Sequence, residues 1–150
     1  MTATTNLPLK EARPDNQAHL LIWDAPTKQE LWQLAYYNNA QRVNYRENLV
    51  NRLNPDDKFL NLHHSIDEEL SAIKGICYDS PRPVVLLEGL DTLVTYLRVK
   101  PGGQVTLFLQ NLEKIRKLES ILWILLPQRL TPPTWPENRI LRVSPAYSSG

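Results

Sequence analysis

Glycine is scarce in the first half of this sequence. The chain of 150 residues has five glycines, and none of them precedes Gly75. A phosphate-binding loop needs glycines in the first strand-to-helix turn, because backbone N–H groups must surround the phosphates there. Residues 24–28 form the corresponding turn here, in which Pro26 has no N–H and Asp24 adds a negative charge. The sequence therefore predicts neither a P-loop nor the dinucleotide-binding turn of a Rossmann fold.

Cysteine, excess charge and long apolar runs are scarce as well. Cys77 is the single cysteine, which excludes an internal disulfide framework and suits a reducing cytosol. The 17 Lys and Arg nearly balance the 16 Asp and Glu, so the net charge of +1 gives no broad field for attracting nucleic acid or an acidic membrane. No apolar run reaches the roughly 18 residues of a membrane span, and the polar start of the chain lacks the apolar core of a signal peptide. We therefore expect a cytoplasmic protein that binds neither nucleic acid nor a membrane.

The sequence does contain two unbroken apolar runs of strand length. Residues 84–87 are all apolar and end at Glu88, and residues 121–126 repeat the pattern after a helical stretch. A strand with one wet face would alternate apolar and polar residues, whereas an unbroken run predicts a parallel strand that is covered on both faces. Two such runs separated by a helix indicate an α/β fold. We expect a three-layer domain with a five-stranded, mainly parallel sheet and helices on both faces.

The remaining pattern divides the chain into three parts. Residues 1–18 are polar, contain Pro8 and Pro14 and show no periodicity, so we expect a flexible N-terminal arm. Residues 144–150 are expected to form a flexible C-terminal tail. Residues 19–143 between them are expected to form a single α/β domain.

Within this domain, helix and strand signals alternate along the chain. Thr27 and Glu30 form a capping box at the start of a helix expected over residues 28–53, with a bend or split near Asn38 and Arg42. A mixed, charged strand at 58–62 is expected at an edge of the sheet. The five expected strands are 19–23, 58–62, 84–87, 121–126 and 139–143.

Acidic residues follow the first apolar run, and two interpretations of them remain open. Glu88 and Asp91 stand where a Walker B segment carries the acid that holds Mg²⁺ or orients a water molecule. They can also cap the positive end of the next helix. Other chemistry is not indicated, since no Gly-x-Ser-x-Gly elbow is present and the adjacent His63 and His64 would point to opposite faces of a strand. We therefore expect no catalytic residues, no metal and no cofactor.

Aromatic residues carry the strongest indication of function. Trp and Tyr are enriched at the hot spots of protein–protein interfaces, although each of them can also belong to a core. Trp135 lies between prolines in a loop and is the hardest of them to explain as a core residue. We expect an apolar groove that binds a protein partner and is lined by Trp23, Trp32, Tyr36, Tyr37, Trp123 and Trp135.

Residues 83–145 resemble the core of an AAA-type P-loop ATPase from its Walker B strand to its last strand. The resemblance rests on the segments 84–91, 107–118, 121–127 and 130–133, which look like the degenerate N-terminal ATPase-like domain of a cyanobacterial and chloroplast family. It implies the strand order 5-1-4-3-2. The chain departs from active members of that class, because it lacks Walker A and has Trp123 and Ile124 where a polar sensor residue is expected. Nucleotide hydrolysis is therefore not expected.

A stand-alone ATPase-like domain of this length without catalytic parts also resembles the CcmS-type assembly chaperones of the cyanobacterial β-carboxysome shell. This resemblance implies association with carboxysomes and binding of a peptide extension of a hexameric shell protein. The sequence thus predicts a non-catalytic module, monomeric or weakly dimeric, that captures an extended or C-terminal segment of a partner. The alternative is a regulatory or weakly nucleotide-binding domain with Lys28, Glu88 and Asp91 as its polar contacts.

Overall fold

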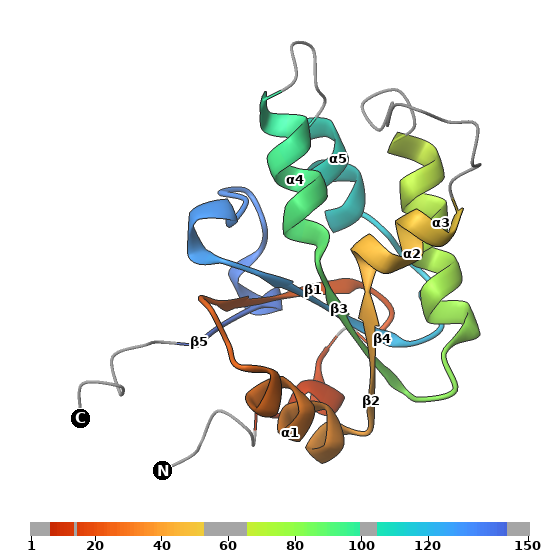
Figure 1. The fold of residues 1–150 in the computed structure, drawn as a ribbon, viewed down its shortest axis with the longest axis vertical. Coiled ribbons are helices and arrows are strands. Elements are labelled where there is room, and N and C mark those ends of the chain that lie inside the picture. Colours follow the sequence, from red (N-terminus) through yellow and green to blue (C-terminus); the bar gives the residue numbers. More distant parts are fainter. Residues whose placement is uncertain (1–6, 14, 53–65, 100–104, 144–150) are drawn as a thin grey trace.

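The computed structural model describes residues 7–13, 15–52, 66–99 and 105–143 (Figure 1). Its centre is a sheet of five parallel strands in the order β2-β3-β4-β1-β5. Counted from the other edge this is the order 5-1-4-3-2, so the predicted α/β fold and strand order are confirmed. The strands are β1 (Ala18–Trp23), β2 (Ala40–Asn44), β3 (Val84–Glu88), β4 (Ile121–Leu126) and β5 (Ile140–Val143).

The inner strands are apolar along their length because both faces of the sheet are covered. Every residue of β1 is buried, although successive side chains point to opposite faces. Leu20 and Ile22 belong to one hydrophobic core, whereas Leu21 and Trp23 belong to a second core on the other side. A single strand therefore anchors helices on both sides, as the unbroken apolar runs predict.

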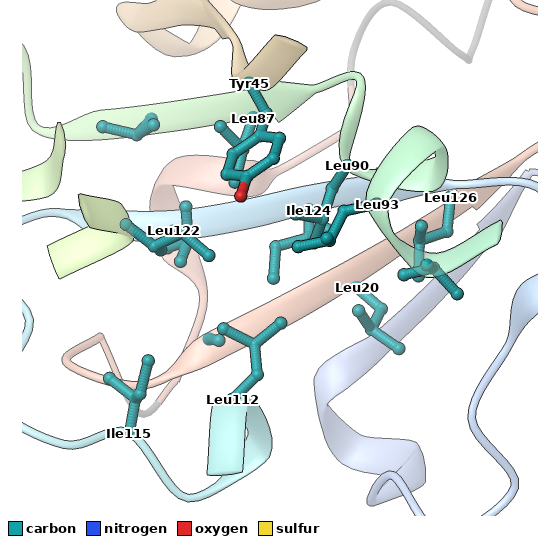
Figure 2. Close-up of a cluster of buried hydrophobic side chains, with 14 of the residues drawn as sticks. Leu20, Tyr45, Leu87, Leu90, Leu93, Leu112, Ile115, Leu122, Ile124 and Leu126 are labelled. Atoms are coloured by element: carbon teal, nitrogen blue, oxygen red, sulfur yellow. The ribbon is translucent and has the colours of Figure 1, made fainter. Parts of the chain in front are cut away.

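The two cores have different helical covers. Figure 2 shows the larger core, in which Leu112 and Leu93 meet the strand residues Leu20 and Ile124. It lies under α3 (Ile66–Asp79), α4 (Leu90–Val99) and α5 (Val105–Glu113), together with the start of α2 (Tyr45–Arg52). In the described part of the chain, the smaller core lies on the other face under one α-helix, α1 (Lys28–Asn38), which Figure 1 shows on the opposite side of the sheet.

The helix expected over residues 28–53 is split near Asn38, as predicted, but a strand that was not expected separates its two parts. The capping box at Thr27 and Glu30 starts α1 as predicted, with both hydrogen bonds formed. Asn39 then adopts the left-handed conformation, with a φ of 52°, which ends the helix and turns the chain into β2. The edge position expected for residues 58–62 is thus held by Ala40–Asn44, which pairs with β3. Residues 58–62 lie outside the described part of the chain.

Part of the segment expected to be a flexible arm packs against the smaller core. Leu9, in the short 3₁₀ helix Leu9–Glu11, is fully buried. Asn38 holds this segment from α1: its Oδ1 accepts a hydrogen bond from the Lys10 N–H at 3.0 Å, and its Nδ2 donates to the Leu7 carbonyl at 2.8 Å. The N-terminal segment therefore completes the layer that α1 leaves open. The expected tail, residues 144–150, lies outside the described residues.

Candidate protein-binding surface

The six aromatic residues expected to line one groove divide into two groups, so that groove is not formed. Three of them, which we call the buried tryptophans, are each at most 5% exposed: Trp23, Trp123 and Trp135. The other three all belong to α1, and we call them the aromatic face: Trp32, Tyr36 and Tyr37. Only this second group is accessible to a partner.

Trp23 and Trp123 are core residues because they lie on the inner strands. Trp123 is central in β4, and its ring stacks at a tilt on His19 with 4.9 Å between centroids. Its Nε1–H donates to the Leu9 carbonyl at 3.0 Å, which satisfies the polar end of a buried indole. These contacts join residues that are 104 and 114 positions apart in the chain, so local sequence does not predict them.

Trp135 is also a core residue, despite its place in a proline-rich loop. It packs in the larger core and lies 5.5 Å from the Arg139 guanidinium. Arg139 is buried and fixed by hydrogen bonds to the Ala18 carbonyl at 2.9 Å and to Glu113 Oε2 at 2.7 Å. The loop is thereby folded back onto the sheet, which explains why the expectation of an exposed Trp135 is wrong.

The aromatic face is the outer side of α1. Leu31, Leu34 and Ala35 point into the smaller core, and the 3.6-residue period places Trp32 and Tyr36 one turn apart on the outer side. Their rings stack with 5.6 Å between centroids and an interplanar angle of 9°. They are 59% and 79% exposed. The helix is therefore apolar on two sides, although only one side can be buried in this chain.

Charge is sparse along the stretch that carries the aromatic face. No charged residue occurs from Leu31 to Gln41, and Gln33 and Asn39 contribute exposed amide groups. Two cations reach this stretch from elsewhere in the chain: Lys10 Nζ lies 5.1 Å from the centroid of the Tyr37 ring, in a cation–π contact, and Arg82 Nη1 donates to Asn39 Oδ1 at 2.6 Å. Depletion of charge around Trp and Tyr is the composition found at the centre of protein–protein interfaces.

The strand ends that would hold a nucleotide in an ATPase are occupied by internal contacts. Asp24 Oδ1 accepts a hydrogen bond from the Gln128 N–H at 2.9 Å, which ties the turn after β1 to the loop after β4. Lys28 is exposed in the first turn of α1, and Asp91 lies in the first turn of α4. The acid at Asp91 therefore fits the helix-capping interpretation.

Glu88 is held in a two-bond ion pair with Arg42. Arg42 Nε lies 2.5 Å from Glu88 Oε2, and Arg42 Nη2 lies 2.9 Å from Glu88 Oε1. The hydrogen bond to Glu88 raises the pKa of Arg42 above its usual value, and burial partly opposes that shift. Gly89 follows with a φ of 85°, and a Cβ there would lie 3.2 Å from Asn44 Oδ1. Glu88 and Gly89 thus join the ends of β2 and β3, a role that sequence reasoning missed.

The described residues give little support for a metal site or for a reactive thiol. Among the described residues, no three His, Cys, Asp or Glu side chains are grouped so that they could hold a metal ion, and His63 and His64 lie outside this part of the chain. Burial raises the pKa of the Cys77 thiol to about 12, so the thiol is protonated at neutral pH. The same described residues include no helix with the length and apolar character needed to cross a bilayer.

Comparison with protein families, with curated proteins and with solved structures finds no match to this chain. The resemblances to an ATPase-like domain and to a carboxysome chaperone therefore stay predictions. The strongest functional feature of the described residues is the aromatic face of α1.

Proposed function

We propose that this protein is a non-catalytic protein-binding module and that its docking surface is the aromatic face of α1. The observation that carries the proposal is the exposed, stacked pair of Trp32 and Tyr36 on a helix whose inner side is committed to the core. An isolated exposed aromatic residue is common on protein surfaces, but a stacked pair flanked by a third ring and amide groups offers contiguous apolar area.

The way α1 is held supports a binding role. Its first turn is fixed by the capping box, and its last turn is fixed by Asn38, which also donates to the Leu34 carbonyl at 3.1 Å. The rings therefore stand on a rigid support, so binding a partner there costs this chain little conformational entropy. Removal of a buried aromatic anchor from an interface of this kind typically weakens binding by about 2 kcal/mol or more.

The narrower form of this proposal is an assembly chaperone, located in the cytoplasm and associated with carboxysomes. In this form the aromatic face holds a peptide extension of a hexameric shell protein until assembly. The support for it is the resemblance in size and character to CcmS-type chaperones, together with a surface suited to an extended or helical segment.

The alternative, weak nucleotide binding, has less support from the geometry. Its three polar contacts would be Lys28, Glu88 and Asp91, but Glu88 already makes two hydrogen bonds to Arg42. Asp24 also places a carboxylate in the turn where phosphates would need N–H donors. Calorimetry with ATP and Mg²⁺ separates the two functions: a dissociation constant below about 100 μM that rises in Glu88→Gln would favour the nucleotide reading.

Affinity capture with matched variants tests the proposed docking surface. The bait is the full chain, used as the wild type, as Trp32→Ala/Tyr36→Ala and as Tyr78→Ala. Tyr78 is a suitable control because it is 71% exposed but belongs to α3, on the other side of the sheet. We expect one protein partner to be retained by the wild type and by Tyr78→Ala and to be lost with the double variant.

Two results would contradict the proposal at different levels. A partner that the double variant retains in full would remove the aromatic face as the docking surface. A partner that is lost as expected but is not a shell component would remove only the carboxysome-specific form.

A further inference from the structure

A second candidate site lies on the face of the sheet opposite the aromatic face. A hollow of about 120 Å³ opens between α4, α5 and the loop that follows β4. Its walls are mainly apolar, and the side chains that form them include Val94, Val105, Leu109, Leu130 and Pro132. It is separate from α1 and from the strand-end residues that an ATPase would use.

Two arginines line this hollow, and neither has an acidic partner among the described residues. Arg98 and Arg129 are both exposed, and Arg98 Nη1 donates to the Arg129 carbonyl at 3.4 Å. Among the described residues, neither guanidinium is paired with a carboxylate, and the lining contains no Asp or Glu. Arg42, Arg139 and Arg142 differ in this respect, since each of them is bound to a glutamate.

Apolar walls beside two guanidinium groups indicate a ligand that has an anionic group and an apolar chain. A guanidinium presents several N–H donors in a plane that matches a carboxylate. The hollow is smaller than the 300–1,000 Å³ typical of cofactor or drug sites, so it suits a short aliphatic chain rather than a cofactor. We propose that it binds a small aliphatic carboxylate of about four to six carbons, with the chain against Leu109 and Val94 and the carboxylate on Arg98 and Arg129.

Titration of the full chain with three probes tests this site. The probes are 4-methylpentanoate, the uncharged 4-methylpentanamide, and N-acetyl-leucine. N-acetyl-leucine has a similar branched side chain and mimics the C-terminal residue of a peptide. Binding is followed by the amide signals of the ¹⁵N-labelled protein. We expect 4-methylpentanoate to bind with a dissociation constant on the order of 1 mM, as suits a ligand of so few atoms. The amide should bind at least about fivefold more weakly, because it lacks the charge.

Variants separate the contribution of charge from that of shape. Arg98→Gln/Arg129→Gln should weaken the acid about tenfold and leave the amide unchanged, since only the acid uses the guanidiniums. Thr106→Trp, at an exposed position on the rim, should weaken both probes by filling the hollow. Arg13→Gln is the matched control, because Arg13 is exposed and bonds only the Ala12 carbonyl among the described residues.

Three outcomes would overturn the proposal. Equal binding of acid and amide would remove the role of the arginines. Signal changes that fall away from Val94, Leu109 and Leu130 would remove the location. Tighter binding of N-acetyl-leucine than of 4-methylpentanoate would replace a free acid by the end of a polypeptide. Because this hollow is independent of the aromatic face, its failure would leave the proposed protein-binding function untouched, and the converse also holds.

Discussion

The buried tryptophans and the aromatic face carry the same residue types but have opposite positions in the fold. The buried tryptophans are enclosed through contacts between distant parts of the chain: Leu9 accepts the hydrogen bond of Trp123, and the Arg139 that packs on Trp135 is fixed by Ala18 and Glu113. Among the described residues, the ring contacts of the aromatic face are with each other and with Lys10, on the outer side of a helix. The difference shows that, of the six aromatic residues, only those that the chain has not enclosed are accessible to a partner. Four pairs of substitutions or conditions test this contrast, in order of decreasing effect on stability.

The largest effect is expected from the core side of the comparison. Trp123→Ala removes a buried indole and its hydrogen bond to Leu9, so the free energy of unfolding should fall by about 3–5 kcal/mol. Trp32→Ala should change it by no more than about 0.5 kcal/mol, because the ring is exposed. Urea unfolding of both variants provides the measurement. Similar losses of unfolding free energy in the two variants would mean that the aromatic face stabilises the fold as much as the buried tryptophans do, which would contradict the contrast between them.

Adjacent asparagines at the end of α1 give the second test. Asn38→Ala should lower the free energy of unfolding by about 2 kcal/mol, since it leaves the Lys10 N–H and the Leu7 carbonyl without their partner. Asn39→Gly should change it by no more than about 0.5 kcal/mol, because glycine accepts the left-handed conformation of Asn39 without strain and the hydrogen bond that it loses, from Arg82 Nη1, is exposed. Thermal unfolding distinguishes them. If Asn38→Ala lowered the free energy of unfolding as little as Asn39→Gly, the N-terminal segment would not depend on α1.

The third test uses the buried thiol on the α3 side. The Cys77 pKa is raised from 9.0 to about 12 by burial, so the unfolded chain loses this proton at lower pH than the folded chain does. The stabilisation is complete below pH 9 and is lost as the pH rises towards 12, by roughly 1 kcal/mol per pH unit. Unfolding of the wild type and of Cys77→Val at several pH values isolates this group from the lysines and tyrosines. A stability difference between the two proteins that stays constant from pH 8 to about pH 11 would contradict the burial of the thiol.

The smallest effect concerns the polar strand ends. Glu88→Gln should lower the free energy of unfolding by about 1 kcal/mol or less, because Arg42 is partly exposed and solvent screens the pair. Glu137→Gln breaks a fully exposed pair with Arg142 and should have no measurable effect. Chemical denaturation of the two variants side by side checks both values. An increase in stability in Glu88→Gln would indicate a carboxylate kept for chemistry rather than for the fold.

The parts of this fold that were predictable are those set by local sequence. The apolar runs at 84–87 and 121–126 predicted buried parallel strands, and Thr27 with Glu30 predicted the start of α1. The strand Ala40–Asn44 was missed because it is short and polar, and what fixes Arg42 is Glu88, 46 residues later. Distant partners decide such positions, and a single sequence does not display them.

The same limit applies to the candidate site. The sequence predicted that Trp and Tyr line a binding groove, but it could not distinguish the buried Trp135 from the exposed Trp32. Trp135 is enclosed because Arg139 reaches Ala18 and Glu113, which are remote in the chain. Trp32 is exposed because it lies on the side of the helix opposite the buried Leu34. The 3.6-residue period would have predicted this if the helix had been expected to end at Asn38.

Site-specific photo-crosslinking shows directly whether a protein partner lies against the aromatic face of α1. In one protein p-benzoylphenylalanine replaces Tyr36, and in a second it replaces the equally exposed Tyr78 on the other side of the sheet. Both are irradiated in extracts of the cells from which the chain comes, and the products are identified by mass spectrometry. We expect a discrete crosslinked protein from position 36 that is absent from position 78 and disappears when Trp32→Ala is added. The same products from both positions, or none from position 36, would contradict the proposed docking surface.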